Sequence, residues 1–307
     1  MAQTTPGLRL AVGARFDDRA TGRASEFAPG ARIIHVDIDP AEIGKNVRVD
    51  LPVVGDARRV LRQILDALQP GSTGAWQEVV DGYRKDLTYP PAREDALTQQ
   101  ATIEAVCRRV AGKAVVATDV GLHQMFVARH IPFDRPRDLL TSGGLGTMGF
   151  GLPAAMGAAL ARPGQEVVAV CGDGSFLMNL QELATIAEHR LPVKAIVLNN
   201  RNLGMVRQFQ RLYFNGSFTA VDQPPHLDFA LIARGFGVAS ASISEPRELE
   251  GALDRALSHP GPFVLEVETD VAEEVLPMVP PGGSLSEMTY EGPREEAERS
   301  ADAPGLR

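Results

Sequence analysis

Two polar residues stand where consecutive apolar segments of this chain end. Asp173, between two glycines, closes the segment 167–174, and Asn200 closes the segment 194–200. The residues between them, 175–190, have the apolar spacing of a helix, which predicts a βαβ unit with parallel strands. Both strands of such a unit end at the same edge of the sheet, so we expect Asp173 and Asn200 to face one cavity. A carboxylate and a carboxamide oxygen are suitable ligands for a hard cation such as Mg²⁺.

The residues next to Asp173 indicate an anionic partner for this cation. Gly174 lets a phosphate approach the backbone, and the helix that begins near Ser175 offers free N–H groups and the positive end of a dipole. The pattern therefore predicts a site for a metal-bound diphosphate. Asp-Gly and Asn-Asn are also common turn formers, so each pair alone is better explained as a structural turn. It is their position at the ends of consecutive strands that favours the site.

The composition is that of a globular protein with a sizeable core. The chain has 307 residues, of which 44% are hydrophobic, and this length allows one or two domains. The net charge of −8, without a basic run, argues against nucleic acids and anionic membranes as partners. Cys107 and Cys171 fall in apolar patterns, so we expect buried, reduced cysteines and a cytoplasmic protein. The uncharged segment 139–161 is rich in glycine and alanine, which predicts a loop and a tightly packed helix rather than a membrane span.

Strand and helix patterns alternate over most of the chain, which predicts an α/β protein with a doubly wound parallel sheet. This domain is expected over residues 99–285. Its strands are expected at 114–118, 138–141, 166–171, 194–199, 237–243 and 262–268. Its helices are expected at 100–111, 121–130, 152–161, 175–190, 203–214, 228–236 and 246–258.

Three further segments flank this domain. Residues 1–70 show two strand patterns and one helix pattern, and we expect them to form a partial α/β central domain. Residues 71–98 are expected to be a linker with one helix, because Pro and Gly interrupt the segment at both ends. Residues 286–307 are rich in Glu, Arg, Pro and Gly, which predicts a loose tail.

The loop from Gly144 to Gly149 matches a second pattern, the G-x-G-x-x-G of dinucleotide-binding proteins. It precedes a helix, and Asp173 ends the next strand, where a ribose-binding acid is expected. Three features argue against this interpretation. Asp173 is flanked by glycines, Asn200 has no role in such a site, and Pro153 begins the following helix late. An NAD-dependent oxidoreductase is therefore the less favoured alternative.

Five segments of the chain are long and specific enough to indicate a family: 13–22, 35–46, 141–158, 199–208 and 277–282. Together with GDG at 172–174 and NN at 199–200, they resemble the large, catalytic subunits of acetolactate synthases (acetohydroxyacid synthases), which depend on thiamine diphosphate (ThDP). The resemblance runs from about residue 8 to about residue 290. It implies a central FAD-binding domain followed by a diphosphate-binding domain, after a pyrimidine-binding domain that this chain does not match.

The resemblance implies a set of residues for ThDP and Mg²⁺. The side chains of Asp173 and Asn200 and the backbone carbonyl of Asn202 would bind the metal. Met148 would hold the cofactor bent, and the carbonyl of Gly146 would accept from its exocyclic amine. The implied ThDP contacts are Val120, Gly121, His123, Gln124, Gly146, Met148, Gly172, Asp173, Gly174, Ser175, Asn200 and Met205.

Some of these residues have simpler explanations without the resemblance. His123 is then better explained as a structural histidine whose hydrogen bonds are made within the protein. Met148 is equally well explained as a side chain that fills a gap in the core. The chain also departs from the family at Leu122, where glutamine is usual, which removes one expected hydrogen bond.

The resemblance also implies a substrate pocket and a flavin site. Val206 and Phe209 would border the second 2-keto acid; Phe209, like Phe126, stands where the family usually has Trp, so acceptor preference stays open. In the central domain, Asp37 ends a strand, where an acid either contacts a nucleotide or is simply solvated. The implied FAD contacts are Gly13, Arg15, Asp17, Arg19, Asp37, Ile38 and Asp56.

The activity implied is that of a ThDP- and Mg²⁺-dependent transferase. The family decarboxylates pyruvate and joins the remaining unit to a second 2-keto acid, either pyruvate or 2-oxobutyrate. The products, 2-acetolactate and 2-aceto-2-hydroxybutyrate, serve branched-chain amino acid biosynthesis, that is, valine and isoleucine. The family's catalytic glutamate lies in the pyrimidine-binding domain, so we expect this chain to be inactive alone.

Two alternatives within the same family are a non-catalytic ThDP- and Mg²⁺-binding remnant and one half of a split ThDP enzyme. The resemblance further implies a homo-oligomer, either a dimer or a tetramer, with a possible small regulatory subunit. A cytoplasmic location, with neither nucleic acid nor membrane as partner, agrees with the composition.

Overall fold

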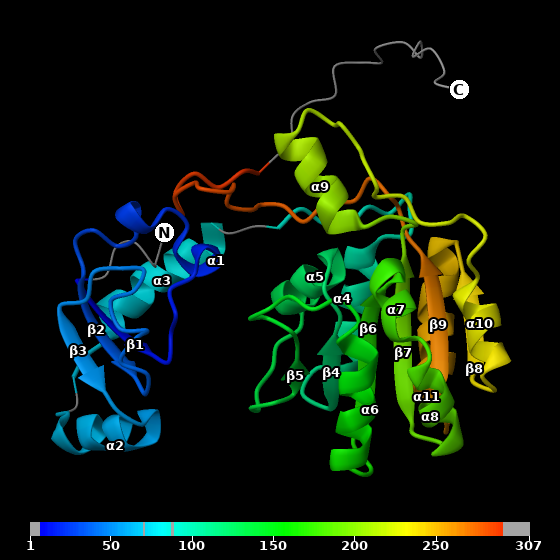
Figure 1. Ribbon diagram of the computed structural model, residues 1–307, viewed down its shortest axis with the longest axis horizontal. Helices are drawn as coiled ribbons and strands as arrows, with labels where there is room; N and C mark the ends of the chain where they lie inside the picture. Colours follow the sequence, from blue (N-terminus) through cyan, green and yellow to red (C-terminus); the bar gives the residue numbers. More distant parts are fainter. Residues whose placement is uncertain (1–6, 70, 87–88, 291–307) are drawn as a thin grey trace. The chain divides into compact units, whose positions relative to one another are not determined.

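The structure is a computed structural model that describes residues 7–69, 71–86 and 89–290. The chain divides into two compact units (Figure 1). The smaller unit contains the chain up to Pro90 together with the segment from Leu276 onward, and the larger unit is Pro91–Val275. Within the described ranges, no helix has the length and apolar character that crossing a membrane requires.

The larger unit contains one six-stranded sheet, in which every strand pairing is parallel. The strand order is β5-β4-β6-β7-β9-β8. The chain places β5 on one side of β4 and the later strands on the other side, and this change of winding direction confirms the predicted doubly wound α/β fold. All six predicted strands are present. They are β4 (Ala114–Thr118), β5 (Leu139–Leu140), β6 (Glu166–Gly172), β7 (Val193–Asn199), β8 (Ala239–Ile243) and β9 (Phe263–Glu268).

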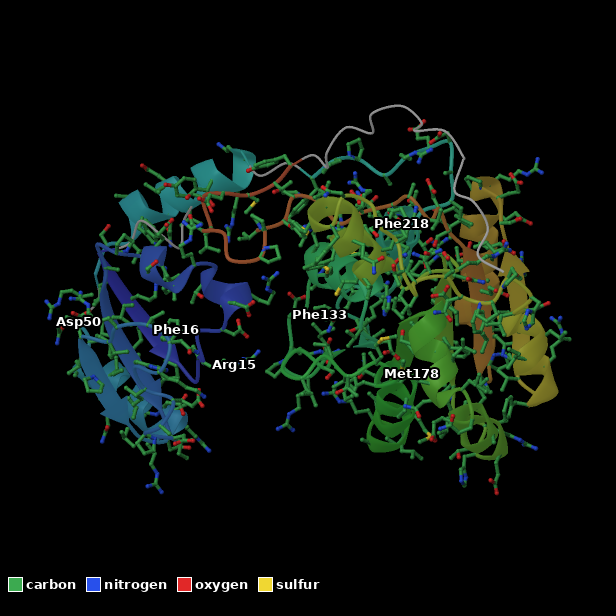
Figure 2. All side chains as sticks on the ribbon, turned by 45° about the horizontal axis from the view of Figure 1, so that its top comes forward. Arg15, Phe16, Asp50, Phe133, Met178 and Phe218 are labelled. Carbon is green, nitrogen blue, oxygen red and sulfur yellow. The ribbon has the colours of Figure 1, made fainter. Side chains whose placement is uncertain are left out.

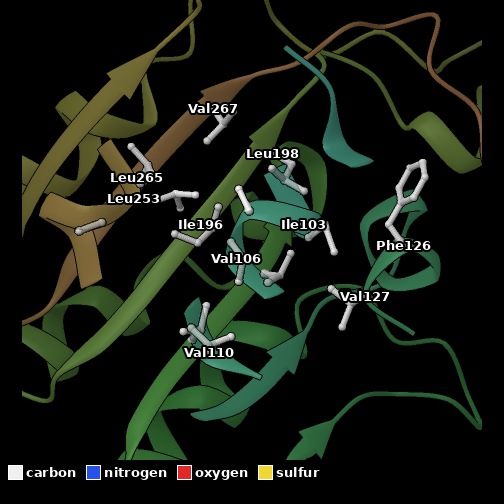
Figure 3. Close-up of a cluster of buried hydrophobic side chains, with 14 of the residues drawn as sticks. Ile103, Val106, Val110, Phe126, Val127, Ile196, Leu198, Leu253, Leu265 and Val267 are labelled. Carbon is white, nitrogen blue, oxygen red and sulfur yellow. The ribbon is translucent and has the colours of Figure 1, made fainter. Parts of the chain in front are cut away.

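Helices connect these strands and cover both faces of the sheet (Figure 1). Because side chains alternate along a strand, Val168 and Val170 of β6 face one layer of helices and Val167 and Ala169 face the other. Figure 3 shows the first of these two apolar clusters. The helices are α4 (Gln99–Val110), α5 (Leu122–His130), α6 (Gly151–Ala161), α7 (Asp173–Asn179), α8 (Glu182–Glu188), α9 (Gly204–Tyr213), α10 (Phe229–Gly235), the 3₁₀ turn η2 (Pro246–Glu248) and α11 (Leu249–Ser258).

The helix predicted at 175–190 differs from the structure in two ways. It begins earlier, at Asp173, and it is interrupted between α7 and α8. At the interruption the N–H groups of Leu183 and Ala184 donate to carbonyls three residues back, those of Leu180 and Gln181. This is the tighter 3₁₀ pattern, which apolar periodicity does not reveal.

The smaller unit contains a three-stranded parallel sheet in the order β1-β2-β3. Two of its strands were predicted, but β3 was not, because it is short and contains Pro52. Pro52 is opposite His35 on an edge strand, a position where a missing N–H is tolerated. The elements are β1 (Leu8–Val12), α1 (Asp18–Thr21), η1 (Ala24–Glu26), β2 (Arg32–Asp37), β3 (Leu51–Val54), α2 (Ala57–Ala67) and α3 (Gly74–Asp86).

A small apolar core holds this unit together. Phe16, labelled in Figure 2, lies in this core. It packs edge-on against Phe27 and His35, with ring centroids 5.7 and 5.0 Å apart. Asp50 fixes the residues directly before β3 to β2, because its carboxylate accepts from the Ile33 N–H at 2.8 Å.

The segment after Leu276 returns to this unit beside α1. The Arg23 N–H donates to the Gly283 carbonyl at 2.7 Å, and the Arg23 side chain reaches Glu287. A side chain at Gly22 would lie 2.6 Å from the Gly283 carbonyl oxygen, so only glycine fits there. Of the tail predicted at 286–307, the part from 291 onward lies outside the described residues.

Candidate functional site

Asp173 lies where β6 ends and α7 begins, and its carboxylate is buried. Oδ1 accepts from the Gly174 N–H at 2.7 Å, whereas Oδ2 has no hydrogen-bond partner among the described residues. Burial raises the pKa of Asp173 to about 6, and the N–H groups of Gly174, Arg201 and Asn202 oppose this shift. The last two groups therefore lie near the carboxylate, although neither makes a hydrogen bond of ordinary geometry with Oδ2. An unpartnered carboxylate oxygen in the interior costs free energy, which a cation would offset.

The loop after β7 supplies the second half of the site. Asn200 and Asn202 are buried, and Asn200 Oδ1 accepts from the Asn202 N–H at 3.1 Å. Asn202 Oδ1 is buried without a partner in the described part of the chain. Between them Arg201 adopts a left-handed backbone with φ of 55°, an uncommon conformation for a side chain of this size. The tight turn thus brings Asn200 and Asn202 to the same pocket that Asp173 lines.

Asn199 has a structural role instead. Its Nδ2 donates to Glu266 Oε1 at 2.8 Å, and its Oδ1 accepts from the Arg201 N–H at 3.1 Å. The first asparagine of the pair therefore joins β7 to β9 and shapes the turn that the second one uses.

A pocket opens at this edge of the sheet, and most residues predicted to contact ThDP line it. Asn202 and Val206 belong to the lining as well. Residues in the lining for which no role was predicted are Gln99, Leu122, Leu198, Leu203 and Gly204. The predicted ThDP contacts in the lining are Val120, Gly121, His123, Met148, Gly172, Asp173, Gly174, Ser175, Asn200 and Met205.

Other predicted residues lie elsewhere. Gln124 donates to the Thr141 hydroxyl at 2.7 Å, and Gly146 is exposed in the loop before α6. Phe209 packs against Tyr213, with ring centroids 5.5 Å apart. Phe126 is fully buried in the core cluster of Figure 3 and does not line the pocket.

His123 packs between two of the turns that form the site. A side chain on Gly121 or Gly172 would lie 2.6 or 2.9 Å from the His123 ring, so both glycines are required by the imidazole. Burial lowers the pKa of His123 to about 3, against a hydrogen bond with the backbone of Asp119. Nε2 has no partner among the described residues. The ring is therefore neutral and offers one free nitrogen beside the pocket.

Gly174 was predicted to leave room for a phosphate, and the structure shows a protein neighbour at this position. A side chain on Gly174 would lie 2.6 Å from Leu203 Cδ2, on the loop that follows Asn202. The glycine therefore allows the two turns of the site to approach each other.

Sequence reasoning missed two carboxylates near the pocket. Glu273 accepts from the N–H groups of Gln99 and Gln100 at 2.6 and 2.9 Å, and so holds the first turn of α4, from which Gln99 lines the pocket. Burial raises the pKa of Glu273 to about 7, and the charge of Asp270 adds to the shift. Asp119, at the end of β4, accepts from N–H groups of the loop before α6. The sequence near Asp119 and Glu273 does not reveal these roles. Except for the Val120 N–H, the N–H groups that donate to the two carboxylates belong to residues distant in sequence.

The residues predicted to contact FAD come together at the carboxyl edge of the three-stranded sheet. Gly13 follows β1 in a left-handed conformation, with φ of 61°, and a side chain there would meet nothing within 4 Å. Asp37 ends β2, where its carboxylate accepts from the Asp39 N–H at 2.9 Å. Ile38 follows it and is 71% exposed.

The remaining predicted FAD contacts have partners within the unit. Asp17 and Asp56 cap α1 and α2, each accepting from an N–H three residues on at 3.0 Å. Arg15 pairs with Asp17 at 2.5 Å, and Arg19 pairs with Asp18 at 3.4 Å.

Comparisons with known proteins match both units. Residues 119–267 match the thiamine pyrophosphate enzyme C-terminal TPP binding domain, and residues 5–64 match the central domain of thiamine pyrophosphate enzymes. The chain is 43% identical to the acetolactate synthase isozyme 1 large subunit of Escherichia coli K12 over 92% of its length. It is 44% identical to the isozyme 2 large subunit and 42% identical to the chloroplastic acetolactate synthase 1 of Zea mays.

The chain is a homologue of acetolactate synthase large subunits. The resemblance inferred from the motifs is thereby confirmed. The homologue covers 51% of each of the two Escherichia coli subunits and 47% of the maize protein, so it spans about half the length of these relatives. The GDG and NN motif lies inside the matched TPP binding domain.

Proposed function

We propose that the larger unit of this homologue binds ThDP through Mg²⁺, as part of an acetolactate synthase type of transferase. Pyruvate would be the donor, and pyruvate or 2-oxobutyrate the acceptor, in branched-chain amino acid biosynthesis. The matched domains are the central and C-terminal ones. We therefore propose that catalysis also needs a pyrimidine-binding domain, encoded with this chain or supplied by a second polypeptide.

One observation carries the proposal. Asp173 Oδ2 and Asn202 Oδ1 are buried acceptors without partners among the described residues, and both residues line the same pocket. Asn200 Oδ1 accepts one hydrogen bond and retains a second lone pair. Oxygen acceptors of this kind fit Mg²⁺, which prefers oxygen ligands and leaves part of its shell to phosphates and water.

The residues of the site suit a cation that binds together with a diphosphate rather than alone. Within the described ranges, no three His, Cys, Asp or Glu side chains cluster in a way that could hold a metal by themselves. A single carboxylate with amide oxygens is a weak site for a free cation and a suitable one for a cation that arrives with a diphosphate.

The residues of this chain would bind and orient the cofactor. Asp173, Asn200 and Asn202 would hold the metal. The neutral His123 ring donates its one N–H to the backbone of Asp119, so its free Nε2 is an acceptor that would border the cofactor. Met148 and Met205 supply apolar contacts in the same pocket. ThDP, when bound, supplies the carbanion chemistry that decarboxylation and carbon–carbon bond formation require. Val206, which lines the pocket, and Phe209, which lies outside the lining on the same helix, are proposed to border the acceptor.

The same proposal includes FAD at the carboxyl edge of the smaller sheet. The open backbone at Gly13 and the exposed Ile38 support it, because both offer surface to a planar ligand. A homo-oligomer, a small regulatory subunit and a cytoplasmic location belong to this proposal too, since they follow from the likeness to the large subunits. The domain limits 1–70, 71–98 and 99–285 remain a proposal.

Calorimetric titration tests the cofactor. ThDP with Mg²⁺ should bind, ThDP with a chelator should bind far more weakly, and NAD should not bind. The melting temperature should rise with ThDP and Mg²⁺ together, because a ligand that binds only the folded state stabilises it. Tight binding of NAD without binding of ThDP would instead support the oxidoreductase alternative.

A second measurement tests the activity. Acetolactate formation from pyruvate should appear when the N-terminal half of the Escherichia coli isozyme 1 large subunit, or the segment encoded upstream, is supplied with this chain. A chain that binds ThDP but stays inactive under both conditions would be a cofactor-binding remnant.

A further inference from the structure

The loop before α6 is anchored by a carboxylate from another strand. Asp119 follows β4 and is fully buried. Its Oδ1 accepts from the N–H groups of Val120 and Gly149 at 2.9 and 2.7 Å, and its Oδ2 accepts from Gly151 at 3.0 Å. A side chain at Gly151 would lie 2.7 Å from the Asp119 backbone nitrogen, so the approach is close enough to require glycine.

The same peptide is held from its other side. Asn179, at the end of α7, donates from Nδ2 to the Gly149 carbonyl at 2.6 Å. Gly149 has a φ of 88°, and a side chain there would lie 2.7 Å from Asn179 Nδ2. Two elements that carry the candidate site, the β4–α5 turn and α7, thus clamp one glycine residue.

This clamp lies directly after a pocket residue. The loop at 143–147 is exposed, and Leu145 within it is 89% exposed, so packing of the loop does not fix the position of the next residue, Met148. Met148 is half-buried and lines the pocket. Before Met148, Ser142 accepts from the N–H groups of Gly146 and Thr147, both at 3.0 Å. After it, the position of Met148 depends on the hydrogen bonds of Gly149, which tie the loop to other elements.

We propose that Asp119 and Asn179 are positioning residues, which hold Gly149 from both sides and thereby set Met148 in the cofactor pocket. The inference rests on the proposed function, because the ligand that Met148 would support is the central part of ThDP. Neither residue has a hydrogen bond with Asp173, Asn200 or Asn202, but the Asp119 carboxylate also accepts from the Ser175 hydroxyl, which lines the pocket. Loss of the Asn179 contact should weaken the binding of whole ThDP and spare the binding of its diphosphate part, whereas loss of the Asp119 carboxylate should weaken both, whole ThDP more strongly.

The test compares two ligands on four forms of the chain. Calorimetry would measure the affinities for ThDP and for inorganic pyrophosphate, each with Mg²⁺. Asp119→Asn keeps the shape but turns an amide donor toward an N–H group, and Asn179→Asp removes the donor to the Gly149 carbonyl. Asp138→Asn is the matched control, because Asp138 is a buried carboxylate of the same unit that pairs with Arg135 and Arg162.

Asn179→Asp should lower the affinity for ThDP by roughly tenfold or more and change that for pyrophosphate by less than about twofold. Asp119→Asn should also lower the affinity for ThDP, with a smaller difference between the two ligands because Asp119 also holds Ser175. Asp138→Asn should leave the ratio of the two affinities unchanged. In the free protein, hydrogen exchange at the Gly149 and Gly151 amides should be faster in Asp119→Asn than in the wild type.

Three results would overturn the inference. In Asn179→Asp, an equal loss for both ligands would mean a general effect on the fold, and an unchanged ThDP affinity would mean that the clamp does not set the pocket. In both of these outcomes the wild type still binds ThDP, so the proposed function stands. A wild type that binds pyrophosphate but not ThDP would refute the proposed function and this inference together.

Discussion

Asp173 and Asn202 each bury a side-chain oxygen without a hydrogen-bond partner among the described residues, and both line one pocket. Asp173 begins α7 directly after β6, and Asn202 lies in the loop after β7; these two strands pair in parallel. Buried acceptors of this kind are normally satisfied, since each one left open costs free energy. A protein that keeps two of them together gives up stability that a bound cation can restore.

Replacing Asp173 by Asn should weaken cofactor binding without lowering the stability of the ligand-free protein. The affinity for ThDP with Mg²⁺ should fall by roughly 10- to 100-fold, because the charged ligand is lost. The unfolding free energy without ligand should stay equal or rise, because the buried charge is removed as well. Chemical denaturation and calorimetry on the same samples measure both quantities. A large loss of stability in the ligand-free protein would show that Asp173 supports the fold.

Glu273 should make stability depend on pH near neutrality. Its pKa is raised from 4.5 to about 7 by burial, with a smaller contribution from Asp270 and an opposing one from Arg93. Stability that is present below pH 4.5 is therefore lost as the pH rises through about 7. Relative to Glu273→Gln, the wild type should lose about 2 kcal/mol of unfolding free energy between these limits. Parallel curves for the two proteins in denaturant titrations at several pH values would contradict the shift.

His123 should remain neutral throughout the physiological pH range. Burial lowers its pKa from 6.5 to about 3, so the folded protein resists protonation that the unfolded chain accepts. The contribution of His123 to stability should therefore decline as the pH falls below 6.5. Its ring signals in NMR spectra should not move between about pH 5 and pH 8. A titration midpoint inside that interval would mean that the ring is solvated.

Two glycines of α6 should respond to alanine in opposite ways. At Gly151 a side chain would lie 2.7 Å from the Asp119 backbone nitrogen, so Gly151→Ala should cost about 1–3 kcal/mol of unfolding free energy. At Gly157 a side chain meets nothing within 4 Å, so Gly157→Ala should add about 0.5–1 kcal/mol through helix propensity. Thermal or chemical unfolding of the two variants measures the contrast. Equal effects would mean that α6 can shift away from Asp119.

The sequence was informative about the elements whose signal is local. The apolar strands and the helices between them have distinct periods, and all six strands of the larger sheet were predicted in their correct places. The motif at Asp173 and Asn200 was found because consecutive parallel strands end at one edge of a sheet. The family could be inferred for the same reason, since its motifs are short and continuous.

Elements with weak local signals were missed. β3 is four residues long and contains Pro52, so neither its length nor its composition predicts a strand. It forms because β2 offers an unpaired edge to Val53 and its neighbours. The interruption between α7 and α8 is also absent from the apolar pattern.

By itself the sequence determined the alternation of strands and helices, the turn residues at the strand ends and the likeness to acetolactate synthase large subunits. The tertiary structure decided what those turns face. Asp119 reaches Gly149 and Gly151, and Glu273 reaches Gln99, across separations that no local pattern encodes. The physical reason is that each carboxylate accepts from backbone N–H groups, which every residue except proline carries, so the partners leave no mark in the sequence.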